Sequence, residues 1–246
     1  MNNNPLLLFT DNDIPFPSAR MVVHNPSIKE LGLIGEETFR IAIYLILHLS
    51  QDIKSQDNFH LGDKEDFDIF IEVINQKDEK SIKYRNNFLS LLSLIFPLYK
   101  LRIRAKDIQF MPIETTENSD IYFIDKTNFQ EFQEIIFNMF ASSSNELGGS
   151  YNPADLRASI IASKLRKMKK HGKDEKNANI SLYKRYASIM SIGMKMDVNI
   201  FLNYTVNQLE TQFKRYTLWA KWDSYFKMKL AGVSGLNEVE DWMQEV

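Results

Sequence analysis

The chain has 246 residues, of which 44% are hydrophobic and 25% are charged, as in an average globular protein. This composition excludes collagen-like, disulfide-scaffold and fully disordered proteins. Thirty Lys and Arg stand against 32 Asp and Glu, so a net charge of −2 gives the whole molecule no general attraction to nucleic acid or anionic membranes. Cysteine is absent, which excludes disulfides, thiolate nucleophiles, zinc ribbons and iron–sulfur clusters and agrees with a reducing cytoplasm.

The start of the chain and its apolar runs predict neither a secretory signal nor a membrane span. Residues 1–4 carry no positive charge before the short apolar run 6–9. The runs 41–49 and 88–101 are shorter than the ~18 to 20 residues that span a bilayer. We therefore expect a cytoplasmic protein made of buried core helices at these positions.

The charge is divided unevenly along the chain. Residues 1–150 have a net charge of −8 and residues 151–246 a net charge of +6, with small polar residues and paired glycines between them at 141–150. This pattern predicts an acidic, mixed α+β domain over 1–140, a linker over 141–150 and a basic, all-helical domain over 151–246. The predicted fold class is α+β and predominantly helical, with a small antiparallel sheet in the first domain.

The elements of the first domain follow from prolines and from hydrophobic periodicity. Three prolines favour extended backbone and one edge strand over 13–26. Alternating apolar and basic residues from Leu101 predict an antiparallel sheet that continues through 108–111 and 121–124. Apolar residues at helical spacing predict helices over 36–50, 67–74, 82–96 and 129–140.

The second domain shows only helical patterns. Asn152 and Pro153 begin a helix that ends among basic residues near Lys170. A second helix runs from Leu182 to Gly193, and a last short one is expected over 237–243. Thr205 and Gln208 form a capping box that begins the longest helix, which Gly232 ends.

No group of residues has the spacing of a catalytic or metal site. His48 lies within an apolar helical pattern, so we expect a hydrogen-bonded core histidine. The acidic cluster 63–68 lacks the glycine and the closing glutamate of a calcium loop and is better explained as a solvated helix start. With 9 glycines and no nucleotide-binding motif, the sequence predicts no enzyme, no cofactor and no metal.

The basic segment Lys164–Lys176 is the strongest electrostatic feature. It holds seven Lys and Arg against two acidic residues. Such a segment can neutralise phosphates, or it can dock on the acidic first domain as a solvated helix end, and we favour the second interpretation. The residues expected to steer an acidic partner are Lys164, Arg166, Lys167, Lys169 and Lys170.

The longest predicted helix carries more aromatic surface than one neighbour could bury. The residues concerned are Tyr216, Trp219, Trp222, Tyr225 and Phe226. Tyr and Trp are enriched at the centres of protein interfaces, which favours a protein partner or self-association. Two alternatives stay open: a compact bundle in which Trp242 and other helices cover the rings, and a stacking platform for single-stranded nucleic acid.

The second half resembles the C-terminal region of tailed-bacteriophage tail-assembly proteins. The segments that carry this resemblance are Tyr151–Arg157, Asn203–Leu209, Phe213–Tyr216, Lys229–Gly232 and Glu238–Met243. They form a pattern of helix caps and aromatic residues over about the last hundred positions.

The resemblance implies a tail-assembly chaperone, or a tail or baseplate assembly factor, made in the cytoplasm of the infected bacterium. Such a protein holds aggregation-prone helical or tube-forming proteins until they polymerise, so the implied partners are a tape-measure, tube or baseplate component. The aromatic residues would supply the apolar contact. The alternatives are a nucleic-acid-binding module that uses Lys164–Lys176 and a minor structural protein of the virion.

Overall fold

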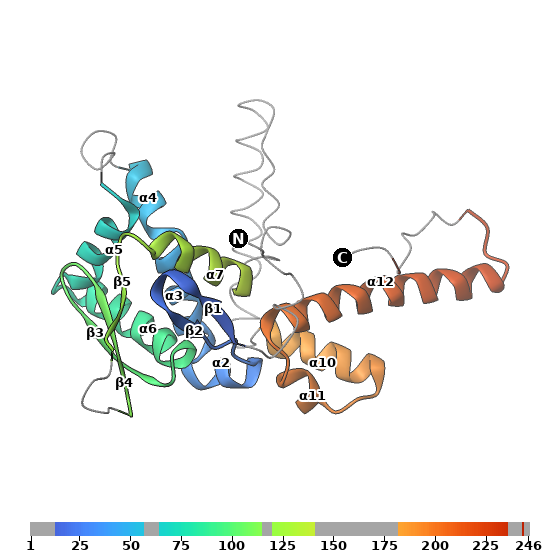
Figure 1. The fold of residues 1–246 in the computed structure, drawn as a ribbon. Coiled ribbons are helices and arrows are strands. Elements are labelled where there is room, and N and C mark those ends of the chain that lie inside the picture. Colours follow the sequence, from blue (N-terminus) through green and yellow to red (C-terminus); the bar gives the residue numbers. More distant parts are fainter. Residues whose placement is uncertain (1–12, 57–63, 115–119, 141–181, 236–242, 244–246) are drawn as a thin grey trace.

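The computed structural model describes residues 13–56, 64–114, 120–140, 182–235 and 243. Within these ranges the fold is predominantly helical α+β, with nine α-helices and two small antiparallel sheets, as predicted (Figure 1). The predicted linker 141–150 and the helix predicted at 152–170 lie outside the described residues, as does all but Met243 of the helix predicted at 237–243. No helix in the described ranges is both long enough and apolar enough to cross a bilayer.

The first described element is a hairpin rather than the single edge strand that the prolines predicted. Strand β1 (Ile14–Phe16) pairs antiparallel with β2 (Met21–Val23) across the short 3-10 helix η1 (Pro17–Ala19). Arg20 adopts the left-handed conformation with φ 54°, and this turn brings the second strand back along the first. Phe16 points into the core, where its ring stacks 6.0 Å from that of Phe132.

Six helices build the body of the first region, and the four predicted there are confirmed within a few residues, with one interruption at His48. They are α2 (Ile28–Ile34), α3 (Glu36–Leu47), α4 (Leu49–Gln56), α5 (Asp66–Asn75), α6 (Glu79–Ile95) and α7 (Phe129–Phe140). Helix α3 packs against both α6 and α7, which explains why apolar residues surround nearly all of it. Helix α6 begins at Asp78, whose carboxylate accepts from the Ser81 amide, and ends before Pro97.

His48 interrupts the predicted helix 36–50, and its expected burial is wrong. Helix α3 ends at Leu47, α4 begins at Leu49, and His48 between them is exposed with its ring 6.3 Å from that of Tyr44. The break at His48 (φ −125°) lets both flanking leucines face the core, so the histidine between them turns outward.

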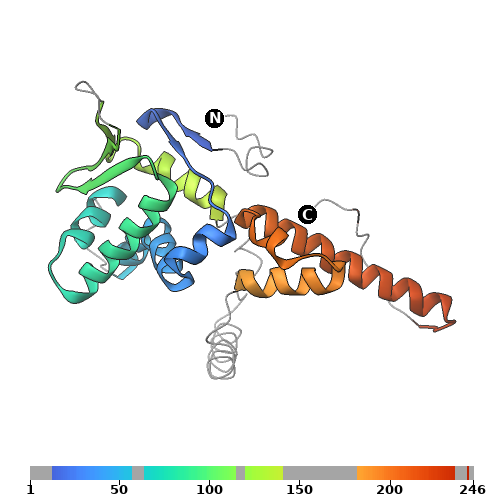
Figure 2. The ribbon, with the colours of Figure 1, turned by 90° about the horizontal axis from the view of Figure 1, so that it is seen from below.

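The predicted antiparallel sheet is confirmed. Its order is β3 (Tyr99–Ile103), β4 (Ile108–Pro112) and β5 (Tyr122–Ile124), with Ile103 opposite Ile108 and Ile108 opposite Ile124. These isoleucines and Phe110 line the buried face, while the alternate residues of β3 are exposed and basic. Figure 2 shows the sheet at the end of the molecule opposite the C-terminal helices.

The described part of the second region is wholly helical, as predicted. It comprises α10 (Leu182–Met194), α11 (Val198–Leu202) and α12 (Val206–Leu230). The short helix α11 was not predicted. Asp197 begins it by accepting a hydrogen bond from the Asn199 amide at 2.9 Å.

The two regions meet around the starts of α2 and α12 and share one hydrophobic core. The amide of Ile28 donates to the Tyr204 carbonyl at 2.9 Å, and the side-chain amide of Asn207 donates to the Asn138 carbonyl at 2.7 Å. The buried residues that the second region contributes to the common core are Ala187, Met190, Phe201, Val206 and Leu209. These contacts fix the direction in which α12 leaves the body of the protein (Figures 1 and 2).

Candidate functional site

The first half of α12 is anchored by its cap and its buried side chains. The Thr205 amide donates to Gln208 Oε1 at 2.9 Å, and the Gln208 amide donates to Thr205 Oγ1, which confirms the predicted capping box. Val206 and Leu209 are fully buried on the side that faces α7 and α10. The start of this long helix is therefore part of the core.

Two aromatic contacts extend this packing to Tyr216. The ring of Phe213 stacks on that of Tyr186 in α10 with centroids 4.0 Å apart. One helical turn further, the Tyr216 ring lies directly on Gly193, so that a Cβ atom at Gly193 would overlap the ring, with Cε2 only 2.7 Å away. Tyr216, predicted as a partner-binding residue, is thus half-buried and holds α12 against α10.

The second half of α12 extends past the end of α10, in two perpendicular views (Figures 1 and 2). Trp219, Phe226 and Leu230 there are 40%, 44% and 74% exposed. Because they are seven and four residues apart, they lie on one side of the helix. We call Trp219, Trp222, Phe226 and Leu230 the aromatic face.

Trp222 joins this face through a ring stack. Its ring lies 5.3 Å from that of Phe226 with an interplanar angle of 5°, while Trp219 stands 6.1 Å from Tyr216. Tyr225 is rotated by about 100° from Phe226 around the helix, and the ammonium of Lys229 lies over its ring at 5.8 Å. The structure thus brings Trp219, Trp222 and Phe226 together, with Tyr216 and Tyr225 at the two margins.

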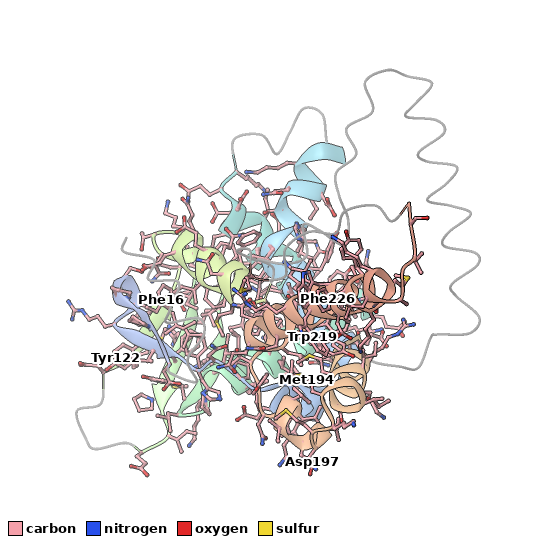
Figure 3. All side chains as sticks on the ribbon, turned by 90° about the vertical axis from the view of Figure 1, so that its right-hand side faces the viewer. Phe16, Tyr122, Met194, Asp197, Trp219 and Phe226 are labelled. Carbon is pink, nitrogen blue, oxygen red and sulfur yellow. The ribbon has the colours of Figure 1, made fainter. Side chains whose placement is uncertain are left out.

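A cleft of ≈ 530 Å³ lies at the inner end of the aromatic face. It is lined by residues of α10 and α12: Gly193, Met194, Gln212, Arg215, Tyr216 and Trp219. Figure 3 looks from the end of the molecule where α12 projects and labels Met194, Trp219 and Phe226. Because Trp219 both lines the cleft and belongs to the aromatic face, the two surfaces are continuous.

Two exposed methionines follow Gly193, and sequence reasoning missed them. Met194, which lines the cleft, is 44% exposed, and Met196 is 39% exposed. We call these two residues the methionine rim. Their position in the sequence was a usable signal. Apolar residues that follow the expected end of a helix are not explained by the helical pattern that faces the core.

Positive charge surrounds the apolar surface. Arg215 lines the cleft, and Lys227 and Lys229 are exposed on either side of the outer end of the aromatic face. Asp223 supplies a negative charge there and pairs with Lys227 at 2.6 Å. The predicted basic residues Lys164, Arg166, Lys167, Lys169 and Lys170 lie outside the described residues.

A buried carboxylic acid lies in the anchored first half of α12, near Tyr183 and Tyr186 of α10. Glu210 is 8% exposed, and within the described structure its Oε2 has no hydrogen-bond partner. Burial raises the pKa of Glu210 to about 7, although Lys214 nearby acts in the opposite direction. Burial, together with the negative charge of Glu210, also raises the pKa values of Tyr183 and Tyr186 on α10.

The remaining polar cluster of note surrounds His24. Its Nδ1 lies 3.1 Å from Asp13 Oδ1 and its Nε2 lies 3.3 Å from Glu30 Oε1, while Glu30 also forms the capping box of α2 with Ser27. This arrangement ties the first hairpin to α2. Among the described residues, no group of three or more His, Asp or Glu is placed to hold a metal ion.

Comparison of the chain with known protein families, with curated proteins and with solved structures gives no match.

Proposed function

We propose that this protein is a non-enzymatic assembly factor that binds an apolar segment of another protein along the aromatic face of α12. The observation that carries this proposal is the projection of two tryptophans, a phenylalanine and a leucine from a rigid helix beyond the body of the protein. Large rigid rings supply contact area at a small cost in side-chain entropy, which is why they dominate binding energy at interfaces.

The cleft and the methionine rim indicate how the partner is recognised. Methionine side chains adapt to irregular apolar surfaces, so the rim suits a partner whose sequence varies along its length. Arg215, Lys227 and Lys229 favour acidic residues beside the apolar ones. An amphipathic helix with acidic margins meets both requirements.

The resemblance in residues 151–246 gives the proposal its biological setting. We place the protein in tailed-bacteriophage morphogenesis, in the cytoplasm of the infected bacterium, as a chaperone or assembly factor for a tape-measure, tube or baseplate component. A long helical protein that awaits polymerisation exposes amphipathic helices, and a surface of this kind would cover them.

The test is affinity capture of the tagged full-length protein from infected or co-expressing bacteria, with nuclease treatment and mass spectrometry. We expect recovery of a tail component, and loss of at least tenfold in recovery when Trp219 and Trp222 are both replaced by alanine. The control is Leu33→Ala, which removes an apolar side chain from α2 that is 82% exposed and lies outside the aromatic face. Circular dichroism and thermal melting establish that the variants keep their fold.

Three results would contradict the proposal. Equal capture by the tryptophan variant and the wild type would show that the aromatic face does not bind the partner. Recovery of nucleic acid without protein would support the alternative function of the segment Lys164–Lys176. Recovery of the protein in stoichiometric amounts from purified particles would favour a permanent virion component over a chaperone.

A further inference from the structure

The solvent side of the three-stranded sheet carries a line of positive charge. Lys100, Arg102 and Arg104 alternate along β3 and the residue that follows it, and all three are exposed. Because two residues of a strand span about 7 Å, these cations are spaced at that interval on one side of the sheet. Lys106 adds a fourth charge in the turn to β4, which the Arg104 amide closes by donating to the Asp107 carbonyl at 2.9 Å.

This positive charge is not neutralised within the part of the chain that the structure describes. None of the four cations forms an ion pair there. Asp107 in the turn is half-buried, and Glu114 and Asp120 lie beyond the other end of the sheet, where β4 ends and β5 begins. Since residues 1–150 have a net charge of −8, the sheet holds a local positive charge within an acidic region.

An exposed aromatic ring lies on the same side of the sheet. The register places Arg102 opposite Gln109 of β4 and Gln109 opposite Phe123 of β5, so these three residues form one row across the sheet. Phe123 is 38% exposed. Neighbouring strands are about 4.8 Å apart, which puts the backbones at Arg102 and Phe123 about 10 Å apart. We call Lys100, Arg102, Arg104 and Phe123 the basic sheet face.

We propose that the basic sheet face binds single-stranded nucleic acid, with Phe123 stacked on a base and the cations of β3 in contact with the phosphates. Every base has a flat π-face, so one exposed ring accepts any base, and cations beside it neutralise the backbone without reading its sequence. The site goes beyond the proposed function, because the sheet lies at the opposite end of the molecule from the C-terminal helices (Figure 2).

The exposed ring selects a single strand among the polyanions. The bases of a duplex are stacked on one another, so a duplex would satisfy the cations and leave Phe123 without a base to contact. An acidic peptide likewise matches the charge alone. Charges on an edge strand such as β3 also prevent pairing with other sheets, but an exposed phenylalanine beside them works against that purpose.

The test is the binding of a fluorescein-labelled oligothymidylate of about 12 nucleotides, a length within the usual site sizes, to the full-length protein. Fluorescence anisotropy at several salt concentrations gives the affinity, and oligouridylate tests RNA in the same way. We expect the logarithm of the association constant to fall with the logarithm of salt with a slope of about −2 to −3, as three or four phosphate contacts produce. Binding that is absent or independent of salt would overturn the proposal.

Two variants separate the contribution of charge from that of stacking. Lys100→Ala with Arg102→Ala should reduce the slope by about 1.4, because each lost phosphate contact removes about 0.7. Phe123→Ala should weaken binding on the order of tenfold and leave the slope unchanged, because only stacking is lost. Phe123→Tyr keeps a ring and should restore the affinity. Circular dichroism establishes that these surface variants keep their fold.

Matched controls address the other basic and aromatic parts of the chain. Lys164→Ala with Arg166→Ala removes two charges from the segment Lys164–Lys176, and Trp219→Ala with Trp222→Ala removes two rings from the aromatic face. Both double variants should bind the oligonucleotide with unchanged affinity and slope. Loss of binding in either control, with unchanged binding by the variants of the sheet, would place the nucleic acid elsewhere and overturn the proposal.

Competition and cross-linking complete the test. Unlabelled single strands should displace the probe, whereas equal displacement by a duplex or by polyglutamate would show that only charge is recognised and would overturn the proposal. Photocross-linking with a thiothymidine in the probe, followed by mass spectrometry, should label the peptide that contains Phe123. A label confined to α12 would contradict this assignment.

The result is independent of the proposed function. Loss of oligonucleotide binding in the sheet variants should leave the capture of a protein partner intact, and the variant that lacks Trp219 and Trp222 should behave in the opposite way. Absent oligonucleotide binding with intact capture refutes only the nucleic-acid site.

Discussion

The two halves of α12 carry similar residues and yet have different surroundings. In residues 206–216 the apolar side chains contact α7 and α10, and Val206 and Leu209 are fully buried. In residues 217–230 the described ring and ion-pair contacts join residues of α12 itself, such as Trp222 with Phe226 and Asp223 with Lys227. The same residue types therefore stabilise the fold in one half and are available for binding in the other.

This difference shows that the types of residue along a helix do not reveal whether they pack in the core or remain exposed for binding. The first half is fixed by a capping box and by contacts from distant parts of the chain. The second half remains helical through its own hydrogen bonds and its Schellman end, since a helix of 25 residues needs no neighbour at every turn. Substitutions in the two halves should accordingly affect different measurements.

The largest effect is expected in the buried half. Leu209→Ala leaves a cavity where α12 meets the core and should lower the free energy of unfolding by about 2 to 5 kcal/mol. Urea denaturation followed by circular dichroism measures this loss. A change below about 0.5 kcal/mol, the size of a surface effect, would show that α12 is not part of the core.

The next effect depends on pH. The folded-state pKa of Glu210, about 7, exceeds its ordinary value of 4.5, so folding is favoured when the carboxyl is protonated. This contribution is complete below pH 4.5 and is lost as pH rises through 7. Glu210→Gln should therefore stabilise the protein above pH 8 by up to about 3 kcal/mol and flatten the dependence of stability on pH between 4.5 and 8.

Denaturation of the wild type and Glu210→Gln over this pH range tests the assignment, with Gln212→Glu as a control that places an exposed carboxyl on the same helix. Parallel pH profiles for wild type and Glu210→Gln would be inconsistent with an acid whose pKa is raised by burial.

The contact between Gly193 and Tyr216 marks the boundary of the two halves. A Cβ atom at Gly193 would overlap the tyrosine ring, so Gly193→Ala should force the ring outward. Overpacking costs about 1 to 3 kcal/mol, and the better helix propensity of alanine offsets up to about 1 kcal/mol of it. Thermal melting should show a lower midpoint for Gly193→Ala, and Gly193→Ala combined with Tyr216→Ala should recover the cost of the clash.

The smallest effect on stability is expected in the exposed half. Trp219→Ala should change the free energy of unfolding by less than about 1 kcal/mol, because its side chain already meets solvent. The difference between the emission of the wild type and that of the variant gives the fluorescence of Trp219. Iodide should quench this fluorescence. A loss of stability as large as that of Leu209→Ala would mean that this ring belongs to the core.

The sequence predicted where the helices and strands lie better than it predicted which of them pack together. The helices at 67–74, 82–96 and 129–140 and the three-stranded sheet were found because their periods are long and regular. Helix α11 was missed because five residues are too few to show a period, although Asp197 is a usable cap signal. The helix predicted from Leu182 to near Gly193 is confirmed, since α10 ends at Met194, but the sequence did not show that Gly193 allows the close approach of Tyr216.

The candidate site required the tertiary structure for a similar reason. The sequence singled out the five aromatic residues from Tyr216 to Phe226. Their periodicity could not separate Tyr216, which packs on α10, from Trp219, which is exposed. Met194 becomes part of the same surface only because α10 lies beside α12. His48 was wrongly expected to be buried. The apolar run around it suggested a core position, but a helix break turns this one residue outward.

The pairing of two helix starts also has a consequence for synthesis of the chain. Ser27, which caps α2, and Thr205, which caps α12, face each other in a β-bridge, and the Ile28 amide donates to the Tyr204 carbonyl. Contacts between such distant positions form late, because the intervening chain must be made and ordered first. We expect the hairpin, sheet and first helices to fold as the ribosome releases them, and α12 to dock last. The apolar surface would thus be presented only by chains whose body is already complete.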